Sequence, residues 1–393
     1  MKIAVKKYFS GISKNTVLLA LASLFSDIST EMLFPVLPIF LTQNLKAGGS
    51  IVGIIEGVAE AIKNIIQGFS GSISDKLQAR KSIALFGYLS SALAKPLIGA
   101  ATVWQGVLGA RFLDRLGSGI RSAPRDALIA SSVEEKNRGK AFGFEGVGDN
   151  LGAFLGPLVA IVLLYAFRVD IRYIFYYALI PGLLSVVMIF LIKEKAVTVN
   201  PKTIVNISFH QFPVSYWKYL LVISLFGIGN SSNSFLILQT RNIGIPLLIT
   251  ILIYTFYNLV AALTSYPAGS LSDKFGRKPL LMTSFIIFFI SYLGFALTRN
   301  IWLIGALFIF YGMYHGIFRS VGKTFAIDFV PQHLRASAVG WFSTVVGLTS
   351  LIASIIAGQL WDKVSHTSVF FFGAIFSLAG ILALSIFIPN EKI

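Results

Sequence analysis

Apolar segments follow one another along nearly the whole chain, separated by short polar loops. Each is close to the roughly 20 residues that an α-helix needs to cross the hydrocarbon core of a bilayer. The segments lack the short alternating pattern of a membrane β-barrel. The pattern therefore predicts an all-α membrane protein with about twelve membrane helices. We expect these helices at residues 15–41, 50–71, 82–100, 104–128, 141–166, 173–192, 217–239, 246–268, 280–298, 301–321, 337–359 and 367–389.

The composition agrees with this pattern and excludes a water-soluble globule. Of the 393 residues, 55% are hydrophobic and 13% are charged, whereas soluble domains carry about 25% charged residues. The 35 glycines favour close helix packing. Cysteine is absent, which excludes disulfides and thiolate metal sites. We expect the lipid bilayer as surroundings, and neither a metal nor a cofactor.

The basic segment Met1–Lys14 precedes the first apolar run. No small-residue cleavage site ends that run, so we interpret it as the first membrane helix and not as a removable signal.

The net charge of +16 would suit nucleic acid, but the basic residues lie in short loops between the apolar segments. They concentrate on alternate loops, around Lys76, Lys136, Lys193 and Lys274, whereas the opposite loops hold only six. The positive-inside rule then places the basic loops and both termini in the cytoplasm. We expect a multi-pass protein of the cytoplasmic (inner) membrane and no nucleic-acid partner.

The longest polar connection, residues 193–216, divides the chain into residues 1–192 and 217–393. We expect two six-helix bundles joined by a cytoplasmic linker. The two halves also repeat in sequence, because Gly71–Lys76 reads again as Gly269–Lys274, 198 residues later.

A second set of matches recurs at an offset of 197 residues. An even number of helices in each half gives a parallel repeat, related by a pseudo-two-fold axis along the membrane normal. The matches pair Gly119, Arg138, Ala141 and Gly143 with Gly316, Arg335, Ala338 and Gly340.

The repeated loop continues as Asp-Lys-Leu-Gln-Ala-Arg-Lys from Asp75 and as Asp-Lys-Phe-Gly-Arg-Lys from Asp273. It resembles the Gly-x-x-x-Asp-(Arg/Lys)-x-Gly-Arg-(Arg/Lys) signature of the major facilitator superfamily, and the second copy is the closer match. The resemblance implies a monomeric transporter that moves a small-molecule substrate by alternating access. It assigns gating to Gly71, Asp75, Arg80, Gly269, Asp273 and Arg277.

Arg111-Phe112-Leu113-Asp114 in the fourth helix resembles the Arg-x-x-Gln start of another motif of this superfamily. Asp114 replaces the Gln, and Arg115 stands where the motif has Gly.

The fifth helix carries a Gly-x-x-x-Gly-Pro sequence at Gly152, Gly156 and Pro157, which resembles the end of the motif associated with antiporters. Glycines four residues apart permit close helix contact, and the proline bends the helix. This resemblance implies export by proton exchange.

Ionisable residues inside membrane helices are costly and usually functional. Asp27 and Glu31 in the first helix are four residues apart and share a face. The resemblance places these acids in a central cavity, across from Arg111 and Arg115. We interpret the acids as proton-coupling groups that protons and substrate compete for; the alternative is a permanent structural ion pair.

The C-terminal half carries amides and aromatic residues where the N-terminal half carries charges. This contrast suggests coupling in the first half and much of the substrate recognition in the second. The candidate cavity residues are Arg111, Asp114, Arg115, Asn230, Asn233, Tyr311, Tyr314 and His315.

The chain has no Walker A, His-Glu-x-x-His or Gly-x-Ser-x-Gly pattern, so we expect neither an ATP-driven protein nor a hydrolase. The sequence favours proton-coupled efflux of a small organic solute. The alternative is import or export of an anionic metabolite or siderophore-like chelate, attracted by Arg111, Arg115, Arg121 and Arg125. A membrane sensor or scaffold would usually add a soluble output domain.

Overall fold

The computed structural model describes residues 12–77, 79–134, 137–194, 211–331 and 334–389. Within these ranges the chain is helical, with short connections and no strand. Most of the expected linker, both chain ends and the lysines before Lys14 lie outside the described residues.

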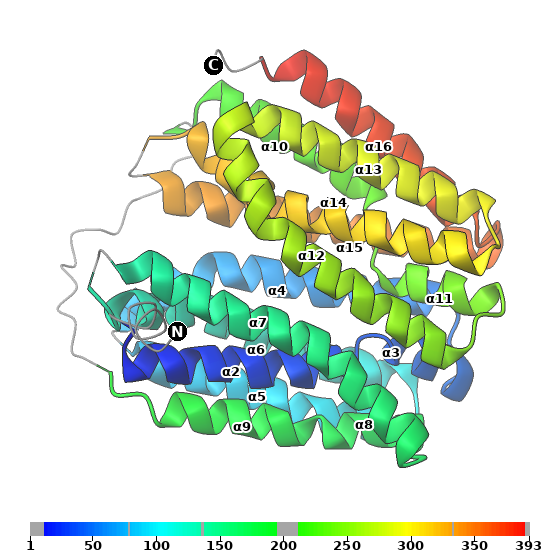
Figure 1. Ribbon diagram of the computed structural model, residues 1–393, viewed down its shortest axis with the longest axis horizontal. Helices are drawn as coiled ribbons and strands as arrows, with labels where there is room; N and C mark the ends of the chain where they lie inside the picture. Colours follow the sequence, from blue (N-terminus) through cyan, green and yellow to red (C-terminus); the bar gives the residue numbers. More distant parts are fainter. Residues whose placement is uncertain (1–11, 78, 135–136, 195–210, 332–333, 390–393) are drawn as a thin grey trace, which may run out of the picture.

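The helices before the linker form one bundle, at the bottom of Figure 1. They are α2 (Lys14–Glu31), α3 (Leu37–Ile39), η1 (Phe40–Asn44), α4 (Gly49–Leu77), α5 (Arg80–Ala100), α6 (Trp104–Ser131), α7 (Arg138–Ile161), η3 (Val162–Ala166), α8 (Ile171–Tyr177) and α9 (Leu179–Phe190).

The helices after the linker form the second bundle, at the top of the same view. They are α10 (Val214–Gly229), α11 (Ser234–Asn242), α12 (Leu247–Phe275), α13 (Arg277–Leu297), α14 (Ile301–Asp328), α15 (Arg335–Lys363) and α16 (Ser368–Phe387).

Each of the twelve expected membrane segments is helical, but three of them are interrupted. The first ends as an α-helix at Glu31, because Pro35 has no N–H to donate to the Glu31 carbonyl. Pro181 likewise leaves the Tyr177 carbonyl without its helical donor, at the break between α8 and α9. The seventh segment is broken at Asn230–Asn233.

The two copies of the repeated motif do not lie in loops as expected. Gly71–Lys76 belongs to the last turns of α4, and Gly269–Lys274 to those of α12. Gly276 then ends α12 with a positive φ of 89°, a conformation that glycine adopts without strain. The motif is therefore a helix end, with the reversal of the chain just beyond it.

Nine helical segments in the described residues are long and apolar enough to cross a membrane. The other three expected spans are the interrupted first one and those of α4 and α6, which carry several buried charges. The chain is therefore a multi-pass membrane protein, and the charges that lower the hydropathy of α4 and α6 mark the interior of the N-terminal bundle.

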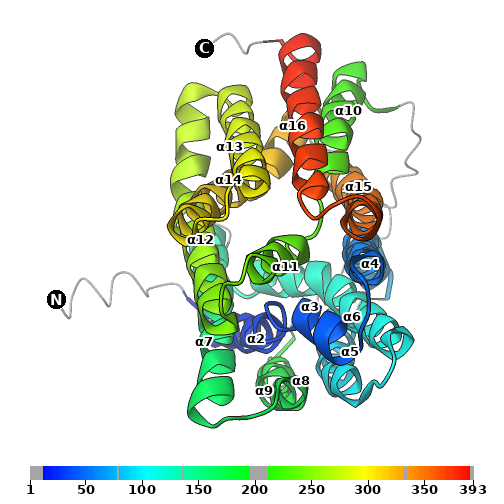
Figure 2. The same ribbon diagram turned by 90° about the vertical axis from the view of Figure 1, so that its right-hand side faces the viewer.

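Helices α4 and α15 form the closest contact between the two bundles and lie side by side in Figure 2. Glycines make this approach possible. A Cβ atom on Gly358 would lie 2.6 Å from the Gly49 carbonyl oxygen, and one on Gly57 would lie 3.1 Å from that of Leu351. Small residues at such crossings let helix backbones meet without side chains between them.

Candidate functional site

Asp27 and Glu31 lie on the face of α2 that packs against α7. A Cβ atom on Gly152 would come within 2.7 Å of the Asp27 Cβ, and one on Gly156 within 2.8 Å of the Glu31 Cβ. Gly152 and Gly156, the two glycines of the motif in the fifth membrane helix, therefore pack directly against the two acids of α2. We call this contact the glycine seat.

Glu31 connects the two bundles directly. Its Oε2 accepts hydrogen bonds from Tyr254 Oη at 3.0 Å and from Asn258 Nδ2 at 3.3 Å, both on α12. Asn258 Nδ2 also donates to the Ala153 carbonyl of α7 at 3.1 Å, and the Phe34 ring stacks on Tyr254 with 5.3 Å between centroids. The charge state of one carboxyl group thus bears on a contact between the halves.

Asp27 reaches the other bundle through two further residues. Its carboxyl group interacts electrostatically with that of Asp149 on α7, the helix whose Gly152 packs against Asp27. Asp149 Oδ2 in turn accepts from Arg319 Nη2 of α14 at 2.9 Å. Two neighbouring carboxyl groups repel each other when both are ionised, which favours a proton on one of them. This chain of three side chains therefore combines a proton-holding pair with a link between bundles.

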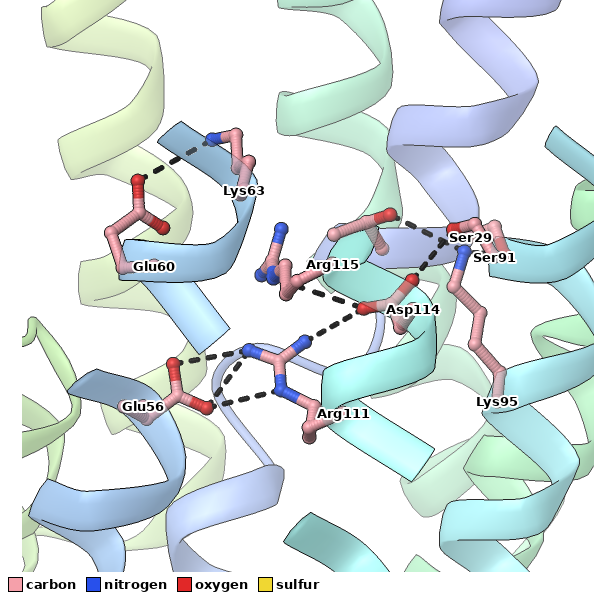
Figure 3. A network of polar contacts seen from close by, with 10 residues as sticks. Ser29, Glu56, Glu60, Lys63, Ser91, Lys95, Arg111, Asp114 and Arg115 are labelled. Atoms are coloured by element: carbon pink, nitrogen blue, oxygen red, sulfur yellow. Dashed lines mark hydrogen bonds and ion pairs between the residues drawn. The ribbon is translucent and has the colours of Figure 1, made fainter. Parts of the chain in front are cut away.

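Arg111 forms its ion pairs with acids of α4 and α6 and not with those of α2. Its guanidinium contacts Glu56 of α4, with Nη2 at 2.8 and 3.0 Å from the two carboxylate oxygens and Nε at 3.2 Å from Oε1. Its Nη1 donates to Asp114 Oδ2 at 3.0 Å, and Asp114 Oδ1 accepts from Ser91 Oγ at 2.6 Å. Figure 3 shows this network, which satisfies every polar atom of Asp114 and Glu56.

Arg115 lies one turn further along α6 and differs sharply from Arg111. It is 7% exposed, and its Nε lies 3.8 Å from Asp114 Oδ2. That distance is an ion-pair contact but not a hydrogen bond, and among the described residues Nε has no hydrogen-bond partner.

Lys95 of α5 is a functional candidate that the sequence analysis did not select. Its fully buried Nζ donates to Ser29 Oγ at 2.6 Å and to Thr30 Oγ1 at 3.3 Å. Ser29 Oγ donates in turn to the Ala178 carbonyl at 2.5 Å. Lys95 therefore holds the turn of α2 that lies between the two acids. The signal was a lysine within an apolar helix, directly before Pro96.

Other buried charges brace helices within the N-terminal bundle. Arg125 of α6 pairs with Glu145 of α7 at 2.9 Å. The Arg121 guanidinium lies over the Tyr88 ring, 4.2 Å from its centroid, a cation–π contact.

The amide of Asn233, at the break between α10 and α11, connects two tyrosines. Its Nδ2 donates to Tyr257 Oη at 3.0 Å and its Oδ1 accepts from Tyr311 Oη at 2.7 Å. The His315 ring lies 5.7 Å from that of Tyr257. The structure thus brings three candidates of the C-terminal half together around Tyr257, which the sequence analysis missed.

The other two candidates of the C-terminal half, Asn230 and Tyr314, lie outside this cluster around Tyr257. Asn230 ends α10 at the same break. Tyr314 directs its ring toward the aromatic core, 4.9 Å from Phe288.

The second copy of the motif forms its ion pairs within one bundle. Arg277 Nη2 lies 2.7 Å from Asp273 Oδ1, and Nε lies 3.3 Å from Asp328 Oδ2 at the end of α14. Gly269 has open space beside it, and Arg80 starts α5. For the other two gating candidates, Gly71 and Asp75, the structure describes only their place in α4.

The described residues contain no group of three acidic or histidine side chains placed to hold a metal ion.

Comparisons with known proteins cover nearly all of the chain. A family model described as Major Facilitator Superfamily matches residues 19–237 and 219–393. An uncharacterized MFS-type transporter of Methanocaldococcus jannaschii, MJ1317, is 36% identical over 383 residues, 95% of each chain. The multidrug resistance protein MdtG of Escherichia fergusonii is 26% identical over 311 residues, covering 75% of this chain and 74% of that relative.

Solved structures share the fold at low sequence identity. A variant of the nucleoside transporter NupG superposes with a TM-score of 0.78 at 14% identity, covering 96% of this chain and all of the other. A D-xylose–proton symporter gives a TM-score of 0.77 at 17% identity, covering 96% and 98% of the two chains.

Proposed function

The chain belongs to the major facilitator superfamily of membrane transporters, and from this premise we propose that it exports a small organic solute in exchange for protons. The observation that carries the proposal is that both acids of α2 connect to the opposite bundle. Glu31 does so through Tyr254, and Asp27 does so through Asp149 and Arg319.

Protonation changes both connections. An ionised Glu31 accepts two hydrogen bonds from α12, and a proton on its carboxyl group removes the charge that strengthens them. Loss of the proton shared by Asp27 and Asp149 leaves two neighbouring like charges, which the hydrogen-bonded Arg319 partly offsets. Proton binding and release therefore shift the balance between arrangements of the two bundles, as rigid-body alternating access requires.

The packing of the α7 glycines against the two acids of α2 supports export. Gly152, Gly156 and Pro157 resemble an antiporter motif, and the glycines contact the acid-bearing turns of α2. The aromatic faces of Phe34 and Tyr254 beside Glu31 suit cationic or apolar solutes. A relative that is named for multidrug resistance agrees with this direction.

We further propose that residues 1–192 and 217–393 are the moving bundles, joined by the linker 193–216 on the cytoplasmic side. Both termini then face the cytoplasm, and the chain acts as a monomer in the cytoplasmic membrane. The helix ends that carry Asp75 and Asp273 are the candidate cytoplasmic gate.

The test is transport by the purified chain in proteoliposomes under an imposed pH gradient, with cationic, neutral and anionic organic solutes scored in both directions. Asp27→Asn and Glu31→Gln are expected to abolish proton-driven transport while the protein stays folded. Glu194→Gln, the same chemical change beyond the last helix of the first bundle, is the matched control and is expected to transport normally. Undiminished proton coupling in both α2 variants would contradict the proposal.

The second candidate function is transport of an anionic metabolite or siderophore-like chelate. The observation that favours it is the buried guanidinium of Arg115, which lacks a hydrogen-bonded carboxylate. Saturable transport of anions in the same solute panel, with cations inert, would select this candidate.

A further inference from the structure

Arg111 and Arg115 are neighbours on one face of α6, yet only one of them is satisfied. Arg111 donates four hydrogen bonds to two carboxylates. Arg115, equally enclosed, makes no hydrogen bond within the part of the chain that the structure describes, and its nearest carboxylate oxygen is 3.8 Å away. The two residues therefore carry the same group on the same face of α6, but Arg115 has more N–H donors without an acceptor.

The carboxylates around Arg115 are already engaged by other groups. Glu56 is held by Arg111, Asp114 by Arg111 and Ser91, and Glu60 by Lys63. Glu31 accepts from Tyr254 and Asn258. Since a guanidinium has five N–H donors in a fixed fork, most of the donors of Arg115 remain available.

The middle of α4, α5 and α6 also carries a positive excess. On these three helices five basic side chains accompany three acidic ones, and the two acids of α2 lie nearby. The basic residues are Lys63, Lys95, Arg111, Arg115 and Arg121, and the acidic residues are Glu56, Glu60 and Asp114.

Arg115 adjoins side chains that solvent reaches. Figure 3 shows its guanidinium between Asp114 and the Glu60–Lys63 pair. The side chains of Glu60 and Lys63 are 39% and 32% exposed. A small molecule that reaches these two residues is therefore next to the free donors of Arg115.

We propose that Arg115 binds an anionic group of the transported solute, a carboxylate or a phosphate, while Arg111 is a structural residue. The inference rests on the proposed transport function and names a chemical feature of its substrate. Charged groups buried in a membrane protein are usually paired or serve a function. The planar fork of an arginine matches two oxygens of a carboxylate or phosphate at once.

This assignment constrains the solute further when it is combined with proton exchange at Glu31. An ionised Glu31 repels a solute whose only charge is negative, so that solute and proton would load together. A solute that replaces the proton at Glu31 must carry a cationic group as well. The exported solute that fits both sites is therefore a small zwitterion.

The test compares the two arginines within one sample of the purified full-length protein. Phenylglyoxal modifies accessible, unpaired guanidinium groups, and peptide mass spectrometry reports the modification of Arg111 and Arg115 separately. We expect severalfold faster modification of Arg115 than of Arg111. Benzoate and inorganic phosphate serve as anionic probes, and benzylammonium as the cationic control.

Benzoate or phosphate is expected to slow modification of Arg115 about twofold at a concentration equal to its dissociation constant. Neither anion should change the rate at Arg111, and benzylammonium should change neither rate. Equal modification of the two arginines, or no selective protection of Arg115 by either anion, would overturn the assignment.

Glu31→Gln separates this inference from the proposed function. We expect this variant to lose proton-driven transport and to keep protection of Arg115 by anions. Retained proton coupling with selective protection would overturn only the coupling role of Glu31. Lost coupling without protection would overturn only the anion site.

Discussion

Arg319 of α14 donates to Asp149 of α7 at 2.9 Å, and this ion pair joins the two bundles beside the candidate proton site. The Arg319 side chain is 62% exposed, so the pair adds at most about 1 kcal/mol to stability. Its importance lies in its position, because Asp149 also interacts electrostatically with Asp27.

Arg319→Gln is expected to lower proton-driven transport severalfold with little change in melting temperature. The reason is that the glutamine leaves the Asp27–Asp149 pair without its offsetting charge. Arg319→Lys keeps the charge and should restore part of the rate. Transport at the wild-type rate in the glutamine variant would show that the pair has no part in coupling.

Arg111 and Arg115 should differ in what they contribute to folding. Removing Arg111 leaves Glu56 and Asp114 as buried charges without their ion-pair partner, so Arg111→Gln should destabilise the protein by about 3–5 kcal/mol. Arg115→Gln removes a cation that makes no hydrogen bond among the described residues and should leave stability nearly unchanged. Thermal unfolding in detergent measures both variants, and an equal loss of stability would contradict the separation of roles.

The seat formed by Gly152 can be tested against another glycine of the same helix. A methyl group at Gly152 would meet the Leu24 carbonyl oxygen at 2.5 Å, whereas Gly146 has open space around its Cα. Gly152→Ala should therefore destabilise the protein by about 1–3 kcal/mol through overpacking and impair transport as it displaces Asp27. Gly146→Ala should be neutral or stabilising. Similar unfolding temperatures for the two variants would rule out the seat.

The helices were predictable because membrane spans are long, apolar and separated by charged loops. Their interruptions were not predicted, because we treated each apolar run as one helix. Pro35 ends α2 at Glu31, four residues before it, because proline has no N–H to donate to the Glu31 carbonyl. The break at Asn230–Asn233 has no proline. There Ser232 N donates to Ser354 Oγ and Ser234 N donates to Ser232 Oγ, so side chains replace helical partners that sequence spacing does not reveal.

The acids of the site were predictable, but their partners were not. Asp27 and Glu31 are conspicuous in an apolar segment, and the cost of burying them marks them as candidates. Their partners come from α7, α12 and α14, and sequence spacing carries no information on which helices meet. For the same reason Arg111 was expected opposite the α2 acids, although Glu56 of α4 is its partner.

A hydrogen-bonded carboxylate also joins the two bundles at the N-terminal end of α4, the end opposite Gly71. The carboxylate of Asp362, near the end of α15, accepts from Gly49 N and Ser50 N at 2.8 Å each and from Ser50 Oγ at 2.6 Å. It thus caps the N-terminus of α4, where backbone N–H groups lack helical partners. Because the cap and the helix belong to different bundles, the bonds must break when the bundles part at this end.

Asp362→Ala should therefore shift the molecule toward the state that is open at this end. Loss of a charged cap costs about 0.5–2 kcal/mol, which changes the ratio of two states by about 2- to 30-fold. The absence of cysteine allows spin labels at Lys46→Cys and Lys363→Cys, and pulsed electron resonance then measures the population of long distances. Asp170→Ala removes a cap within one bundle, from Arg172 N, and should leave the distances unchanged. An unaltered distribution in the Asp362 variant would mean that the glycine-packed contact of α4 with α15 keeps this end closed without the carboxylate.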